Sequence, residues 1–159
     1  MARPLRSGRG RQAGRPTRAI EGGGVMDEDE RYDAVVLGSA IYASRWRPDA
    51  IGLLKLLAAR TDELRPVHTW LFQSGPCGDH ADDQVSTPKK VAKLAHLIGT
   101  AAPITFGGRL EPATAKGFLA RKMATGPMAG DFRDLERVRG FADSIAERLT
   151  APKPAVNWR

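Results

Sequence analysis

The sequence predicts an α/β protein with a parallel sheet and helices on both faces. Short apolar runs alternate with segments of helical periodicity, and the connections between the runs are long enough for helical crossovers. Two of the three apolar runs also end in loops of small residues. In such sheets, ligands bind beyond the carboxyl ends of the strands, near the point where the strand order reverses. These loops are therefore the candidate positions for functional residues.

The elements follow from the period of the apolar residues. The run 34–37 predicts a strand buried on both faces and closed by Gly38 and Ser39. Pro48 suits the first position of a helix that is expected to continue to about Leu64. Next come a strand over 67–72, an amphipathic helix over 91–98 and a strand over 104–106. The last helix is indicated by a stripe of Leu135, Val138, Ala142, Ile145 and Leu149, with Asp131 or Asp134 as its cap.

The two ends of the chain differ from its middle. Residues 1–30 are rich in Arg and Gly and have no apolar period, so we expect a disordered extension. It contributes much of the net charge of +7, which therefore says little about the rest. A targeting segment and an electrostatic RNA-binding arm are alternatives, and Met26 is a second candidate start. The chain of 159 residues then divides into the extension 1–30, one domain over 31–150 and a Pro-rich tail over 151–159.

Cysteine and histidine usage excludes two classes of site. Cys77 is the only cysteine, so neither an intramolecular disulfide nor a cysteine cluster for zinc is possible. The three histidines are scattered without ligand spacing, so we expect no metal site. No apolar run is long enough to span a membrane. We interpret the chain as cytoplasmic.

The candidate binding site consists of two loops that follow neighbouring strands. Small residues let the backbone approach a flat ligand, and an aromatic ring can stack on it. The loops 39–46 and 74–79 therefore predict a slot for a planar ring with polar edges. The candidate ligand-binding residues are Ser39, Ala40, Ile41, Tyr42, Trp46, Ser74, Gly75, Pro76, Cys77, Gly78 and Asp79.

Four segments, in order, resemble the flavodoxin-domain family, in the branch of the menaquinone-dependent protoporphyrinogen oxidases. They are YDAVVLGSAIYASRW, FQSGPCGD, FGGRLEP and GDFRDLERVRGFADSIA, within roughly residues 31–150. The resemblance implies a flavodoxin-like three-layer α/β/α sheet with FMN as cofactor, its ring flanked by the two loops. It also implies a flavoprotein oxidoreductase of haem biosynthesis that transfers electrons from a tetrapyrrole to a quinone.

The match begins at the third strand of the family pattern. Residues 1–30 contain neither an apolar strand nor a Ser/Thr-rich loop of the kind that holds the FMN phosphate. We therefore expect a fold that is incomplete at its N-terminus, from a truncated or mis-started chain. The strand at 34–38 then becomes an open apolar edge.

Several residues allow two interpretations. Ser39 can bond a ring edge or cap the following turn. Cys77 can be a redox thiol, but a small apolar filler is the better interpretation. Asp79 and His80 can transfer protons near a bound flavin or be solvated loop residues. Arg109 can pair with an acidic group of a substrate or be an ordinary surface arginine. The basic and apolar segment 116–123 suits contact with a membrane, a quinone or a tetrapyrrole, or a helix packed on the sheet.

Three functions compete. The first is the FMN-dependent oxidoreductase. The second is a non-catalytic or truncated flavodoxin-fold module that does not hold FMN and pairs through its open strand edge. The third is a nucleic-acid-binding protein that uses the Arg/Gly-rich extension, and we favour it least.

Overall fold

The described part of the chain forms four helices and six strands. The computed structural model describes residues 32–60, 66, 68–75, 77–78, 85–113 and 118–151, without the side chains of 119, 120 and 123. The predicted extension 1–30 and nearly all of the predicted tail lie outside these residues. The elements are β1 (Ala34–Tyr42), β2 (Arg45–Trp46), α1 (Pro48–Ala59), β3 (His68–Ser74), α2 (Lys89–Ile98), β4 (Ile104–Phe106), β5 (Arg109–Leu110), α3 (Phe118–Met123), β6 (Gly130–Asp131) and α4 (Leu135–Thr150).

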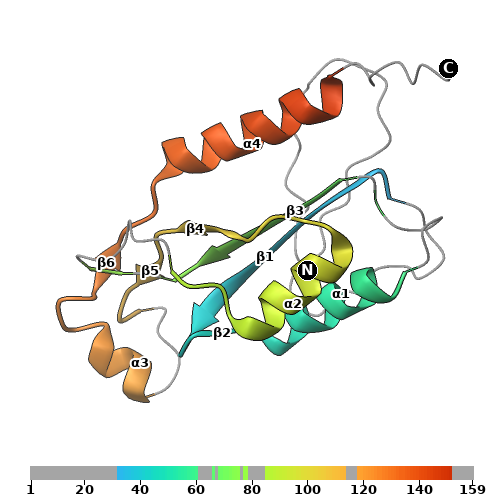
Figure 1. Ribbon diagram of the computed structural model, residues 1–159. Helices are drawn as coiled ribbons and strands as arrows, with labels where there is room; N and C mark the ends of the chain where they lie inside the picture. Colours follow the sequence, from blue (N-terminus) through green and yellow to red (C-terminus); the bar gives the residue numbers. More distant parts are fainter. Residues whose placement is uncertain are drawn as a thin grey trace, which may run out of the picture.

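A four-stranded sheet has the order β2-β1-β3-β4. Strands β1, β3 and β4 are parallel, and Ala34 to Ala40 pair in register with His68 to Ser74. Helices α1 and α2 lie against one side of the sheet, and α4 lies on the opposite side (Figure 1). The predicted α/β class with a mostly parallel sheet is therefore confirmed. Strands β5 and β6 form a separate antiparallel pair.

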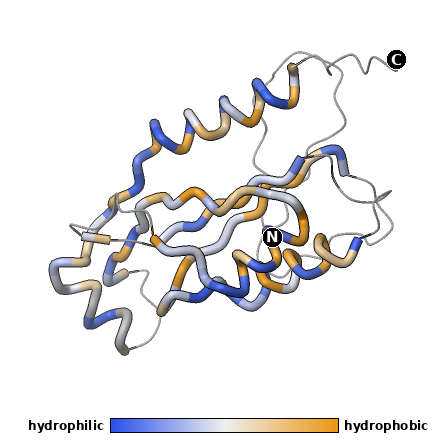
Figure 2. Tube along the Cα trace, in the orientation of Figure 1, coloured by the Kyte–Doolittle hydropathy of each residue, from blue (hydrophilic) through white to orange (hydrophobic). Residues whose placement is uncertain are grey.

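The main core lies between the sheet and helices α1 and α2. Leu54 and Leu57 of α1 and Val91 of α2 have no exposed surface and pack over Leu37 and Leu71 of the sheet. Burial of each such side chain contributes about 1.5–3 kcal/mol. The same segments stand out as apolar along the trace in Figure 2. Helix α1 ends at Ala59 because Arg60 is extended, so the expected continuation to Leu64 was wrong.

Helix α4 is held to the other side of the sheet mainly by aromatic contacts. The Phe141 ring lies 6.5 Å from the Phe72 ring and 5.7 Å from the Phe106 ring. A Cβ on Gly38 would lie 2.0 Å from Cζ of Phe72, so this glycine provides the space for the ring. Asp134 caps α4 by accepting a hydrogen bond from the Arg137 N–H at 2.9 Å, which decides between the two expected caps.

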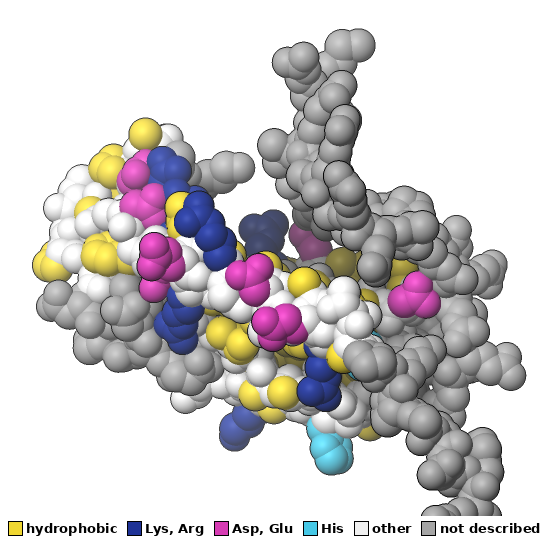
Figure 3. Space-filling model, turned by 90° about the horizontal axis from the view of Figure 1, so that it is seen from above, with side chains coloured by type: hydrophobic (Ala, Val, Ile, Leu, Met, Phe, Trp, Pro, Cys, Tyr) yellow, Lys and Arg dark blue, Asp and Glu magenta, His cyan; other side chains and the backbone are white. Residues whose placement is uncertain are grey.

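Much of the apolar surface on the α4 side is uncovered. Leu135 and Leu149 of the predicted stripe are 57% and 48% exposed, and no residue of α4 is buried. Seen from above, the surface mixes acidic, basic and apolar side chains (Figure 3). None of the described helices is long and apolar enough to cross a membrane.

Strand β1 has an open side. Within the described residues it pairs with β3 on one side, while on the other side β2 pairs only with Ile41 and Tyr42. The stretch from Ala34 to Ala40 therefore has one unpaired backbone edge in this part of the structure. Val36, on this stretch, is 47% exposed. Residues 1–31 lie outside the described part of the chain, so the expectation of an open apolar edge stays a prediction.

Candidate functional site

The first candidate loop is a β-hairpin. Strand β1 continues through Gly38, Ser39 and Ala40 to Tyr42, and it then turns into β2. Ala43 and Ser44 form the turn with φ of 47° and 58°, the positive values that a type I′ hairpin turn requires. The expectation of a loop with free backbone amides over 39–46 was therefore wrong, because most of these residues are paired in strands β1 and β2.

The two aromatic residues of the hairpin lie in different environments. Tyr42 is 66% exposed, whereas Trp46 is only 5% exposed. The Trp46 Nε1–H donates a hydrogen bond of 3.0 Å to Oε1 of Gln73, and Trp46 belongs to the core beneath α1 and α2. Of the two rings, only that of Tyr42 is available to stack on a ligand.

Ser39 uses its side chain within the protein. Its hydroxyl accepts a hydrogen bond of 3.0 Å from the Arg47 N–H and donates one of 3.0 Å to the Ala40 carbonyl. Arg47 immediately precedes α1, so Ser39 ties the end of the hairpin to the start of that helix. This favours the turn-capping interpretation of Ser39.

The second candidate loop packs directly on β1. Ser74 is the last residue of β3, and the Gly75 N–H donates to the Phe106 carbonyl at 3.4 Å. A Cβ on Gly75 would lie 3.0 Å from the Ile41 carbonyl oxygen, so a larger residue would push the loop away from the hairpin. Ala40 pairs with Ser74. The structure thus brings the two predicted loops together at one edge of the sheet.

Two backbone N–H groups at this edge, those of Cys77 and Gly78, have no hydrogen-bond partner among the described residues. Gly78 has a φ of 69°, and a Cβ there would lie 3.0 Å from the Pro127 carbonyl oxygen. Pro76, Asp79 and His80 lie outside the described residues.

Cys77 behaves as a small apolar side chain. It is 8% exposed, and its Sγ lies 3.5 Å from the Gly75 carbonyl. Burial raises the pKa of its thiol, although a hydrogen bond from the Gly108 backbone opposes that shift. The raised pKa keeps the thiol protonated at neutral pH, and a thiolate is the reactive form. These features favour the filler interpretation of Cys77.

The sequence did not reveal the buried residues that stabilise this edge of the sheet. Gln73 is fully buried, and its Nε2 donates hydrogen bonds of 3.0 Å to the Val85 carbonyl and to Oγ1 of Thr105. Together with the bond from Trp46, these contacts join β2, β3 and β4. A Cβ on Gly108 would lie 3.1 Å from Sγ of Cys77, so Gly108 lets the two loops approach. The sequence Gln73-Ser74-Gly75 follows an apolar run and looks like the start of a loop, so it did not indicate that the Gln73 side chain is buried.

The other singled-out residues lie among charged side chains. Arg109 forms an ion pair with Glu111, so its charge is already partnered. Arg133 donates to Asp131 at 2.7 Å and lowers the pKa of that carboxyl to about 2. Phe118 of α3 is 86% exposed. Lys116 and Gly117 lie outside the described residues.

The exposed Tyr42 ring is the aromatic group at this edge that can stack on a flat ligand. Among the described residues, no Ser/Thr-rich loop of the kind that binds the FMN phosphate is present. No group of three His, Cys, Asp or Glu side chains converges as a metal site within the described ranges. Comparisons of the chain with protein-family models, with curated proteins and with solved structures found no match, so the resemblance to the flavodoxin family stays a prediction.

Proposed function

We propose that this chain is a flavodoxin-like domain that binds the isoalloxazine ring of FMN at the carboxyl edge of β1 and β3. The observation that supports this best is the close approach of the two segments: a Cβ on Gly75 would lie 3.0 Å from the Ile41 carbonyl oxygen, and Ile41 is followed by the exposed Tyr42. Ligand sites in parallel α/β sheets lie at this edge.

Each residue has a definite part in the proposed site. Tyr42 stacks on the ring, and the N–H groups of Cys77 and Gly78 donate to its polar edge. Trp46 and Ser39 do not contact the ligand; they fix the hairpin from the helical side.

We further propose an oxidoreductase of the protoporphyrinogen oxidase type, with a tetrapyrrole as electron donor and a quinone as acceptor. FMN would supply the electron transfer, and the protein would bind and orient it. Helix α3 supports contact with a membrane that carries the quinone, because Phe118 is exposed beside the exposed cations Arg121 and Lys122.

The Tyr42→Ala variant tests the flavin site. Loss of a stacked ring is expected to weaken FMN binding by about 0.5–1.5 kcal/mol, which is a factor of about 2 to 13 in the dissociation constant. The dissociation constant is measured by quenching of flavin fluorescence. Tyr32→Ala is the matched control, since Tyr32 lies before the opposite end of β1, and it should bind FMN like the wild type. Equal affinities for the wild type and the Tyr42 variant, or no FMN binding at all, would contradict the proposal.

A second candidate function is an interaction module that uses the open side of β1. The edge between Ala34 and Ala40, which has no pairing strand among the described residues, and the exposed Val36 favour it. An extended segment of another chain would add to the sheet there through main-chain hydrogen bonds. We expect self-association at high concentration that Val36→Lys weakens, since charge on an edge strand opposes pairing. Sedimentation that shows a monomer at all concentrations would contradict this function.

A further inference from the structure

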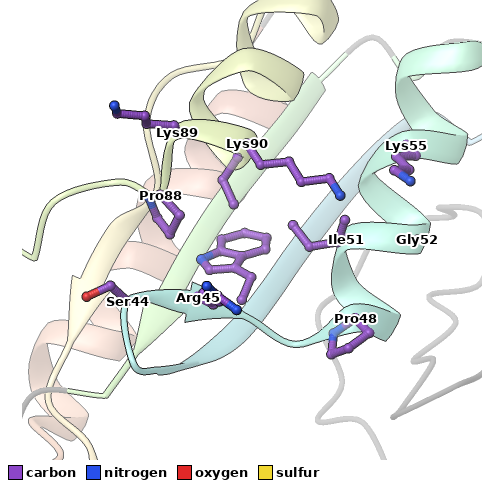
Figure 4. Close-up of a pocket in the computed structure, with 11 residues that line it drawn as sticks. Ser44, Arg45, Pro48, Ile51, Gly52, Lys55, Pro88, Lys89 and Lys90 are labelled. Atoms are coloured by element: carbon purple, nitrogen blue, oxygen red, sulfur yellow. The ribbon is translucent and has the colours of Figure 1, made fainter.

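A half-open surface cavity of about 640 Å³ lies on the helical side of the sheet, beside β2. This volume is within the range of small-molecule sites, about 300–1,000 Å³. Its walls come from the hairpin turn and β2, from α1 and from the N-terminal end of α2 (Figure 4). The lining residues are Ser44, Arg45, Trp46, Pro48, Ile51, Gly52, Lys55, Pro88, Lys89, Lys90 and Val91.

The charges around this cavity have one sign. Arg45, Lys55, Lys89 and Lys90 line it, and no carboxylate does. None of the four makes an ion pair or a hydrogen bond through its side chain in the described part of the chain. In Figure 4, Lys90 reaches across the cavity toward Ile51 and Lys55, whereas the end of Lys89 points away from them. Four unpartnered cations around one hollow repel one another and favour an anion between them.

The N-terminus of α2 adds further donors to the same wall. Pro88 is its N-cap and provides no side-chain hydrogen bond, and the first turn has no acidic residue. The first helical bond runs from the Ala92 N–H to the Pro88 carbonyl, so the N–H groups of Lys89, Lys90 and Val91 have no partner among the described residues. Two lysines at the positive end of a helix dipole are an unfavourable arrangement. A bound anion would relieve this repulsion.

We propose that this cavity binds an organic phosphate. Lysine ammonium groups act as point charges for phosphate, and unpaired N–H groups at a helix N-terminus add directed donors. The apolar wall made by Pro48, Ile51 and Pro88 would hold the organic part of the ligand. This site is separate from the proposed flavin site, since Tyr42 and the 75–78 segment do not line the cavity.

Titration with inorganic pyrophosphate tests the anion site on the full chain. Binding is followed by calorimetry and by the ¹⁵N–¹H shifts of the Lys90 and Val91 amides, at constant ionic strength because salt screens such contacts. Lys90→Ala and Lys55→Ala should each weaken binding by about tenfold, the loss expected for one charge-assisted hydrogen bond. Lys93→Ala is the control: Lys93 is an exposed lysine of α2 outside the cavity, and its loss should leave the affinity within about twofold.

Each outcome decides the proposal. Saturable binding that depends on Lys55 and Lys90 but not on Lys93 would support it. No saturable binding, or an equal loss in all three variants, would overturn it, because the second result indicates only general attraction. Binding of the chain to vesicles of anionic phospholipid without binding of pyrophosphate would also overturn it, in favour of a membrane surface. None of these outcomes depends on whether FMN binds at the carboxyl edge.

Discussion

Replacing Leu54 by alanine is expected to destabilise the domain by about 2–5 kcal/mol. Leu54 has no exposed surface and lies at the centre of the core between α1, α2 and the sheet. The substitution removes one methine and two methyl carbons and leaves a cavity that neighbouring side chains fill only partly. Because a domain of this size has a total stability of about 5–15 kcal/mol, the loss is a large part of it. Urea unfolding followed by circular dichroism measures the change.

Leu97→Ala is the matched control for this experiment. Leu97 lies on α2, but it is 52% exposed. Its truncation should change the free energy of unfolding by no more than about 0.5 kcal/mol. Similar losses for the two leucine variants would contradict the position of the core described above.

The Gln73→Ala variant is expected to lose about 3 kcal/mol of stability. The substitution breaks three hydrogen bonds of 3.0 Å and leaves the Trp46 Nε1–H and the Val85 carbonyl without this partner. A buried polar group without a partner costs about 1–3 kcal/mol. The Trp46 ring should also become more exposed to water, which shifts its fluorescence emission to longer wavelength. Thermal and urea unfolding give the stability.

Gln73→Met separates the hydrogen bonds from the lost volume. Methionine nearly fills the space of glutamine but can neither accept from Trp46 nor donate to Thr105. We expect this variant to be clearly destabilised as well. Wild-type stability in Gln73→Met would show that packing at this position matters and the hydrogen bonds do not.

Much of the sheet and its helices was predictable, because the spacing of apolar residues and the length of each apolar run indicate strands and helices directly. Strand β4 occupies the predicted residues 104–106, and α2 differs from its predicted range only by the added Lys89 and Lys90. Both elements have strong local patterns: an apolar run closed by glycines, and apolar residues at helical spacing. The cap of α4 was predictable only as one of two aspartates, and the structure shows that it is Asp134, which directly precedes the apolar stripe.

The hairpin was not predictable in the same way. Type I′ turns are usually signalled by Asn-Gly or Gly-Gly, but here the two central residues are Ala43 and Ser44. Small residues in Gly38–Ala40 indicated a loop, although pairing with β3 makes this stretch a strand. The role of Gln73 and the cationic cavity depend on residues far apart in the sequence, so no local pattern reveals them.

The most direct test of the proposed flavin site is a ¹⁵N–¹H NMR titration of the full chain with FMN. The proposal predicts that the amide signals of Tyr42, Gly75, Cys77 and Gly78 shift together and saturate at one equivalent. Shifts confined to Lys90 and Val91 would place the phosphate of FMN in the cationic cavity and contradict a flavin site at the carboxyl edge. An unchanged spectrum would contradict flavin binding altogether.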